Sequence, residues 1–142
     1  MQRWEKGSQA MVTVNAIFAG FSGALVAVLI ASTESKRPCW MQLSMILAVA
    51  SLILFALAAE KITDALDEGK VTTYLCSMLI YNIAVVLLFL SIATFLVFRS
   101  YYGPGVITFL GIFYPWLKDI YWFIFAKKTD KQDYIEELRK ES

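Results

Sequence analysis

The sequence contains no histidine, two cysteines and three prolines among its 142 residues. The lack of histidine removes the commonest metal ligand and the commonest general base near neutral pH. The long apolar stretches also hold no paired acids and no serine or cysteine beside a base, so nothing is arranged for acid–base or nucleophilic catalysis. We therefore expect no enzymatic activity, no metal site and no cofactor.

Charge is scarce as well. Charged residues make up 18% of the chain, the formal net charge is +1, and the basic residues form no stripe that would follow a phosphate backbone. Nucleic acid is thus not an expected partner. Hydrophobic residues reach 58%, whereas a soluble domain is nearer half apolar. This excess indicates that the lipid bilayer surrounds much of the chain.

Four stretches approach the roughly 20 apolar residues that a helix needs to cross about 30 Å of hydrocarbon. They are residues 10–32, 39–59, 73–98 and 105–126. The sequence therefore predicts an all-α integral membrane protein, with a four-span transmembrane domain over residues 1–126 and a short cytoplasmic amphipathic helix over 127–142.

The basic residues between the spans predict the orientation, because cytoplasmic loops carry an excess of lysine and arginine. One side holds nine of them: Arg3, Lys6, Lys61, Lys70, Lys127, Lys128, Lys131, Arg139 and Lys140. The other side holds three: Lys36, Arg37 and Arg99. We expect a multi-pass protein of the cell membrane with both termini in the cytoplasm. Cys39 and Cys76 would then lie on opposite sides of the bilayer, too far apart for a disulfide.

The first span is rich in small residues at helical spacing, a pattern that lets membrane helices approach closely. The residues expected to pack are Ala16, Gly20, Gly23 and Ala27. Two interpretations stay open: a tightly packed helix at the centre of one subunit, or a helix surrounded by copies of itself about a symmetry axis.

The fourth span carries two intramembrane charges, Lys118 and Asp119. They are adjacent and so project about 100° apart on a helix. Pro115 just before them removes a backbone hydrogen bond and predicts a kink. Either the bent helix ends near the cytoplasmic interface, where both charges reach the headgroups, or one of them is buried and bonded to another helix.

The C-terminal segment has the features of a short helix. Thr129 and Gln132 have the spacing of a capping box, and Tyr134, Ile135 and Leu138 form a narrow apolar stripe. Such a helix is too short to be stable alone. We expect it to pack on a neighbouring helix, on a regulatory partner in the cytoplasm, or on the membrane surface.

Four short stretches, one in or just after each span, resemble the Orai calcium channels. Ala19-Gly20-Phe21 resembles a Ser-Gly-Phe stretch of their pore helix, and the runs 54–57 (LFAL), 87–90 (LLFL) and 128–132 (KTDKQ) resemble stretches of the second span, of the third span and beyond the fourth. The resemblance implies an oligomer of four-helix subunits, with the first helix around a pore and the cytoplasmic tail involved in gating.

Carried onto this chain, the resemblance implies a row of residues that face the axis of the pore. They are Gln9, Thr13, Ile17, Phe21, Ala24 and Val28. The acidic ring of the family would fall at Val28, which cannot bind a cation, so calcium selectivity is not expected.

Two functions follow as alternatives. The first is a homo-oligomeric channel or pore-forming protein with the first helix near the symmetry axis, gated from the cytoplasmic side. The second is a non-conducting membrane adaptor or assembly protein that presents its cytoplasmic tail to a partner.

Overall fold

A computed structural model of the chain describes residues 2–32 and 38–140. The connection 33–37, which includes Lys36 and Arg37, lies outside the described residues. The described elements are all helical: α1 (Arg3–Ala31), α2 (Cys39–Glu68), α3 (Val71–Phe98), α4 (Tyr102–Ile107), the π-helical turn η1 (Thr108–Ile112), α5 (Phe113–Phe125) and α6 (Lys128–Arg139). The prediction of an all-helical chain is thus confirmed for these residues.

Three of these helices, α1, α2 and α3, are long and apolar enough to cross a membrane. α1 begins at Arg3 rather than near residue 10, because the polar residues that precede the apolar stretch are helical too. Its start is capped by the Glu5 carboxylate, which accepts a 2.7 Å hydrogen bond from the Gln2 backbone N–H. α2 likewise runs past its apolar part and ends at Glu68, and the next residue, Gly69, has a left-handed φ of +64° that suits a helix C-terminus.

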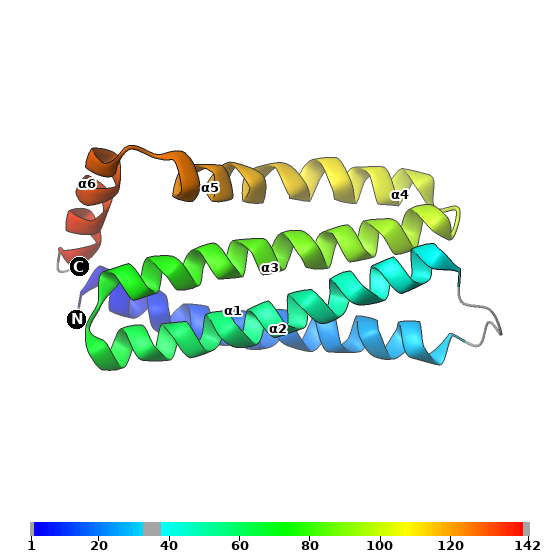
Figure 1. Cartoon of the computed structure of the whole chain (residues 1–142), viewed down its shortest axis with the longest axis horizontal. Helices are drawn as coiled ribbons and strands as arrows, with labels where there is room; N and C mark the ends of the chain where they lie inside the picture. Colours follow the sequence, from blue (N-terminus) through cyan, green and yellow to red (C-terminus); the bar gives the residue numbers. More distant parts are fainter. Residues whose placement is uncertain (1, 33–37, 141–142) are drawn as a thin grey trace.

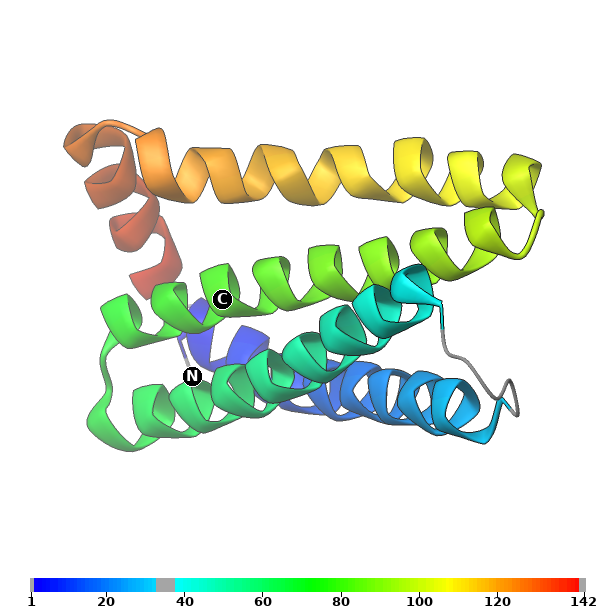
Figure 2. The ribbon, with the colours of Figure 1, turned by 45° about the vertical axis from the view of Figure 1, so that its right-hand side comes forward.

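The fourth expected span is not one regular helix. It is divided into α4, η1 and α5, which together run alongside α3 (Figures 1 and 2). α5 alone has 13 residues, or about 20 Å at 1.5 Å per residue, which is too short to cross the hydrocarbon. The kink predicted at Pro115 stays a prediction, because the irregularity among the described residues is the π-helical turn η1, which ends three residues before it. Pro115 itself lies in the first turn of α5, which is where proline is tolerated best in a helix.

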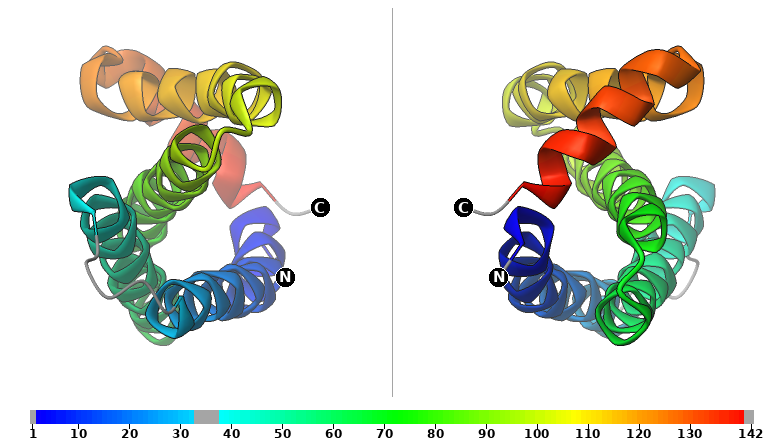
Figure 3. Two further views of the ribbon diagram at one scale, coloured as in Figure 1. Left: turned by 90° about the vertical axis from the view of Figure 1, so that its right-hand side faces the viewer. Right: turned by 90° about the vertical axis from the view of Figure 1, so that its left-hand side faces the viewer.

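The helices pack in chain order and form an open arc. α1 contacts α2, α2 contacts α3, and α3 contacts α4, η1 and α5, whereas no described Cα of α1 lies within 8 Å of one in α5. Viewed along the helices, the arc leaves a side open between α1 and α5, and α6 crosses it at one end (Figure 3). The two termini lie at that same end (Figure 1).

Gly105 lets α4 approach α3 closely. A Cβ at this position would lie 2.6 Å from the Val97 side chain and 3.3 Å from the Val97 backbone nitrogen. The hairpin between the two helices also places Ser100 at a φ of +68°, a conformation that residues other than glycine seldom adopt. Close contact with α3 therefore fixes where the fourth helical segment begins.

Candidate functional site

Paired serines join the long helices. Ser22 of α1 and Ser51 of α2 have hydroxyl oxygens 2.9 Å apart, and both residues are fully buried. Ser44 of α2 and Ser91 of α3 form a second buried pair across the next interface. Hydrogen bonds of this kind hold helices together in lipid, where no hydrophobic effect drives association. Ser22 therefore takes part in packing between α1 and α2.

α1 has one covered and one uncovered face. The buried residues of the helix are Trp4, Ser8, Asn15, Ser22 and Leu29. The six residues that the Orai resemblance assigns to a pore are all exposed in the single chain: Gln9, Thr13, Ile17, Phe21, Ala24 and Val28. They lie away from α2 and α3, and no other helix among the described residues covers them.

The small residues expected to pack are also largely uncovered. Ala16, Gly20 and Ala27 are exposed, Gly23 is half-buried, and a Cβ at Gly20 or Gly23 would meet nothing within 4 Å. α1 is at an edge of the arc (Figure 3). The small-residue face thus contributes little to packing within the described part of the chain.

α6 packs on the start of α1 and on α3. Ile135 and Leu138 contact the buried cluster of Trp4, Ala65, Val71 and Tyr74. Arg3 forms an exposed 3.4 Å ion pair with Glu137, and its backbone N–H donates to the Lys140 carbonyl at 3.3 Å. Of the three surfaces proposed for this helix, its own chain is the one that the structure shows.

The predicted capping box of α6 is wrong. The helix begins at Lys128 with Lys127 at the N-cap, and no side chain caps it. The hydroxyl of Thr129 instead lies 3.4 Å from the Asp130 carboxylate. The apolar residues of the stripe position α6, since they are half-buried against the other helices.

A cavity of about 670 Å³ lies inside the arc, bounded by α1, α3, α5 and α6. Aromatic rings form much of its wall. Tyr81 of α3 meets Trp116 of α5 edge-to-face at 5.6 Å between ring centres, and Trp122 of α5 meets Tyr134 of α6 in the same way at 5.3 Å. The volume lies within the range of sites for small organic ligands.

The two charges of α5 are separated by the helix. Asp119 borders this cavity, whereas Lys118 borders a different hollow on the outer side of α5. Both residues are exposed, and no ion pair of Asp119 is present among the described residues. Burial raises the pKa of the Tyr134 phenol above its ordinary value, and the charges of Glu137 and Asp119 raise it further.

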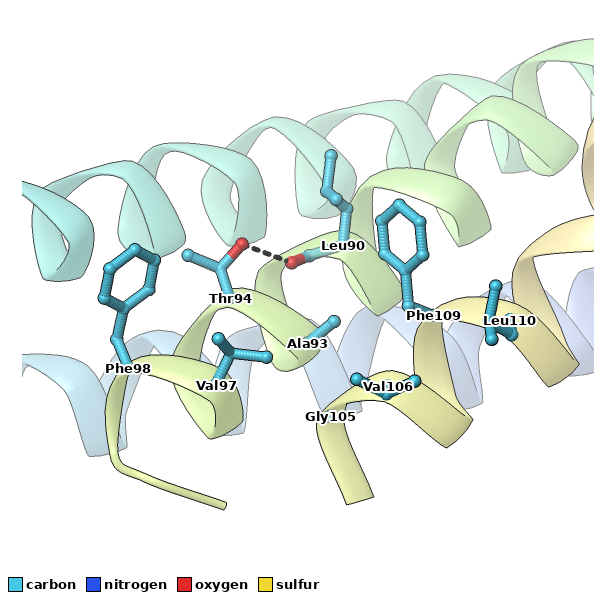
Figure 4. Close-up of a pocket in the computed structure, with 9 residues that line it drawn as sticks. All are labelled: Leu90, Ala93, Thr94, Val97, Phe98, Gly105, Val106, Phe109 and Leu110. Carbon is cyan, nitrogen blue, oxygen red and sulfur yellow. Dashed lines mark hydrogen bonds between the residues drawn. The ribbon is translucent and has the colours of Figure 1, made fainter. Parts of the chain in front are cut away.

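The other hollows offer little chemistry. One of about 300 Å³ lies between α3 and the segment formed by α4 and η1 (Figure 4). Its one hydroxyl, on Thr94, donates to the Leu90 carbonyl of its own helix at 2.8 Å. Apart from that internal bond its wall is apolar, which suits contact with lipid rather than recognition of a polar ligand.

Cys39 and Cys76 are both free and exposed. Cys39 begins α2 and Cys76 lies near the start of the antiparallel α3, so they are near opposite ends of the molecule (Figure 1). The described residues contain no group of three or more acids or cysteines that could hold a metal ion.

Comparisons with protein-family models, with curated proteins and with solved structures find no match for this chain.

Proposed function

We propose that the chain is one subunit of a homo-oligomeric membrane channel, with α1 near the symmetry axis. The observation that carries the proposal is the uncovered face of α1. This face has no side chain at Gly20 and Gly23, and a Cβ at either position would meet open space. A second copy of the helix can therefore approach closely there. A single chain leaves this face of α1 to lipid or to another subunit.

Four spans and cytoplasmic termini complete this arrangement. The segment from α4 to α5 runs beside α3 for much of its length and would cross the bilayer as an interrupted helix (Figure 2). Irregular backbone at membrane depth is tolerated where neighbouring helices cover it. The charge asymmetry of the sequence favours a cytoplasmic position for the end that holds both termini and α6.

α6 supplies a connection between the cytoplasm and α1. Its hydrogen bond and ion pair with Arg3, together with the contact of Leu138 near Trp4, join it to the first turn of the proposed pore helix. A partner or ligand that moves α6 would therefore act on α1. This favours gating from the cytoplasmic side.

The axis-facing residues predict a closed resting state. Ile17, Phe21 and Val28 are apolar, and a narrow apolar constriction stops conduction by excluding water. Val28 stands where the Orai resemblance places an acidic ring, so the open channel would discriminate poorly between ions.

The mass of the complex in mild detergent tests the proposal. We expect a multiple of the subunit mass of 16.1 kDa, measured by light scattering with the detergent contribution subtracted. Gly20→Leu or Gly23→Leu should reduce the oligomer, because added bulk forces the backbones apart at a cost of about 1–3 kcal/mol. Gly103→Leu is the control, since this glycine also faces open space but lies on α4, which does not contact α1.

A monomer that stays monomeric in lipid nanodiscs would overturn the channel. It would leave the adaptor as the remaining hypothesis, in which the charged outer side of α6 meets a cytoplasmic partner.

A further inference from the structure

The cavity inside the arc is lined by a polar side chain that forms no hydrogen bond with any other described residue. Asn82 of α3 is 4% exposed, borders the cavity, and makes no hydrogen bond within the part of the chain that the structure describes. In the described part of the chain the fully buried side-chain atom without a partner is Oδ1 of Asn15, so the amide of Asn82 is open to the cavity that it lines. Its presence at the wall of a cavity indicates that something in the cavity, a ligand or water, completes its hydrogen bonding.

The charge of the cavity is of one sign. Asp119 is the charged residue at its wall, and the neighbouring cation, Lys118, lies on the other side of α5. The carboxylate is therefore not neutralised where it meets the cavity. An anion would be repelled there, and a wholly apolar molecule would leave both Asp119 and Asn82 unpaired.

The walls favour a cation whose charge is spread over carbon groups. Tyr81 and Trp116 form one side, and Trp122 and Tyr134 form another. The faces of tryptophan and tyrosine rings attract such cations, by about 2 kcal/mol or more when water is excluded. A Ca²⁺ or Mg²⁺ ion would need several oxygen ligands, whereas one carboxylate and one amide are available here.

We propose that this cavity binds a lipophilic organic cation of the quaternary ammonium or phosphonium type. The cation lies against the aromatic rings, Asp119 supplies the counter-charge, and Asn82 bonds to a polar group or a retained water beside it. The cation enters through the open side of the arc between α1 and α5, which is the side that a molecule dissolved in the bilayer would reach.

Binding of tetraphenylphosphonium to the purified full chain in maltoside detergent tests the site. Quenching of tryptophan fluorescence reports it, because Trp116 and Trp122 are at the wall. We expect saturable binding of this cation and no saturable binding of tetraphenylborate, an anion of nearly the same size and shape. Asp119→Asn should lower the affinity for tetraphenylphosphonium by about tenfold or more, since it removes a charge at short range.

Lys118→Gln is the matched control, because it changes the adjacent charge on the opposite side of the helix. We expect the affinity of this variant for tetraphenylphosphonium to stay within about twofold of that of the unsubstituted protein, since Lys118 does not line the cavity. Trp122→Leu should also weaken binding of tetraphenylphosphonium, in proportion to the loss of one ring face. Helical circular dichroism and elution volume check that each variant is folded.

Competition identifies the source of the ammonium group. Displacement by tetraethylammonium alone identifies a free cation, and displacement by dihexanoylphosphatidylcholine identifies the headgroup of a choline lipid; both support the proposal. Equal binding of tetraphenylphosphonium and tetraphenylborate, or an Asp119→Asn variant with unchanged affinity, would overturn it. The oligomer mass is a separate measurement, so failure of this site leaves the channel proposal standing.

Discussion

Ser44 of α2 and Ser91 of α3 hydrogen-bond each other reciprocally. The Ser91 hydroxyl donates to the Ser44 carbonyl at 2.6 Å, the Ser44 hydroxyl lies 2.9 Å from the Ser91 carbonyl, and the two hydroxyl oxygens are 3.0 Å apart. Each serine thus satisfies the other at full burial, and 47 residues of sequence separate them. This pair fixes the register between the two most extensively packed helices.

The serine pair should couple energetically. Ser44→Ala and Ser91→Ala should each lower the free energy of unfolding, and a double-mutant cycle should give a coupling of about 1 kcal/mol, as for interhelical hydrogen bonds in membranes. Unfolding by sodium dodecyl sulfate, followed by circular dichroism, measures it. Thr63→Ala is the control, because Thr63 is exposed and bonds to its own helix. Purely additive effects of the two serines would contradict the reciprocal bonding.

A side chain at position 105 should lower the stability of the protein. Gly105→Ala should destabilise the protein by about 1–3 kcal/mol, because its Cβ would lie 2.6 Å from a methyl group of Val97. Gly103→Ala, two residues away in open space, should be neutral or stabilising, since alanine favours a helix by up to about 1 kcal/mol over glycine. The same unfolding assay compares them. Equal stability of the two variants would mean that α4 does not pack against α3.

The two free cysteines report the topology. A membrane-impermeant maleimide added to intact cells should label Cys39 and leave Cys76 unlabelled until the cells are opened, because the two lie near opposite ends of the molecule. Cys39→Ser and Cys76→Ser variants assign the label. Labelling of Cys76 in intact cells would reverse the proposed orientation.

Conduction should depend on the uncovered face of α1. Ile17→Ser should wet the constriction and cause a constitutive leak, seen as depolarisation of expressing cells. Ile53→Ser is closely matched, because both isoleucines are 54% exposed in the single chain while Ile53 lies on α2. We expect no leak from Ile53→Ser. A leak from both variants would indicate general loss of packing, and silence from both would favour the non-conducting adaptor.

The attachment of α6 should depend on its apolar contact more than on its ion pair. Leu138→Asp should release the helix and increase hydrogen exchange over residues 128–139, because it puts a charge against the cluster around Trp4. Glu137→Gln should have little effect, since exposed ion pairs contribute about 0.2–1 kcal/mol. Unchanged exchange in Leu138→Asp would show that α6 is held by something else.

The sequence predicted the long helices well because their signal is local. Apolar runs predicted α1, α2 and α3, although α2 continues beyond its apolar stretch to Glu68. The start of α1 was missed because polar residues such as Glu5 form part of the helix by capping it. The division of the fourth span was missed for a related reason: hydropathy measures apolar content and carries no information on backbone hydrogen-bond register.

The candidate sites were harder to predict because they depend on contacts between distant segments. A single asparagine in an apolar run, such as Asn82, gives no indication of its partners, and its lack of a partner among the described residues becomes visible only once α5 and α6 are placed beside it. Asp119 was recognised as an intramembrane charge, yet which neighbour it faces depends on the rotation of α5. The partners Ser51 and Ser91 carried no signal, since serine is common in membrane helices and pairing is a tertiary property.

The turn η1 sets the rotation of the fourth helical segment about its own axis. A π-helical turn accommodates one residue more than an α-helical turn, so it allows Gly105 to face α3 while Asp119 faces the cavity. If residues 108–112 were converted to regular α-helix without a change in length, everything after them would turn by about 100°. Asp119 would then leave the cavity wall. Within this segment, the length of the chain therefore matters as much as the identity of its residues. Removing one residue together with the π-helical turn would keep Asp119 facing the cavity, whereas forming a regular α-helix at unchanged length would not.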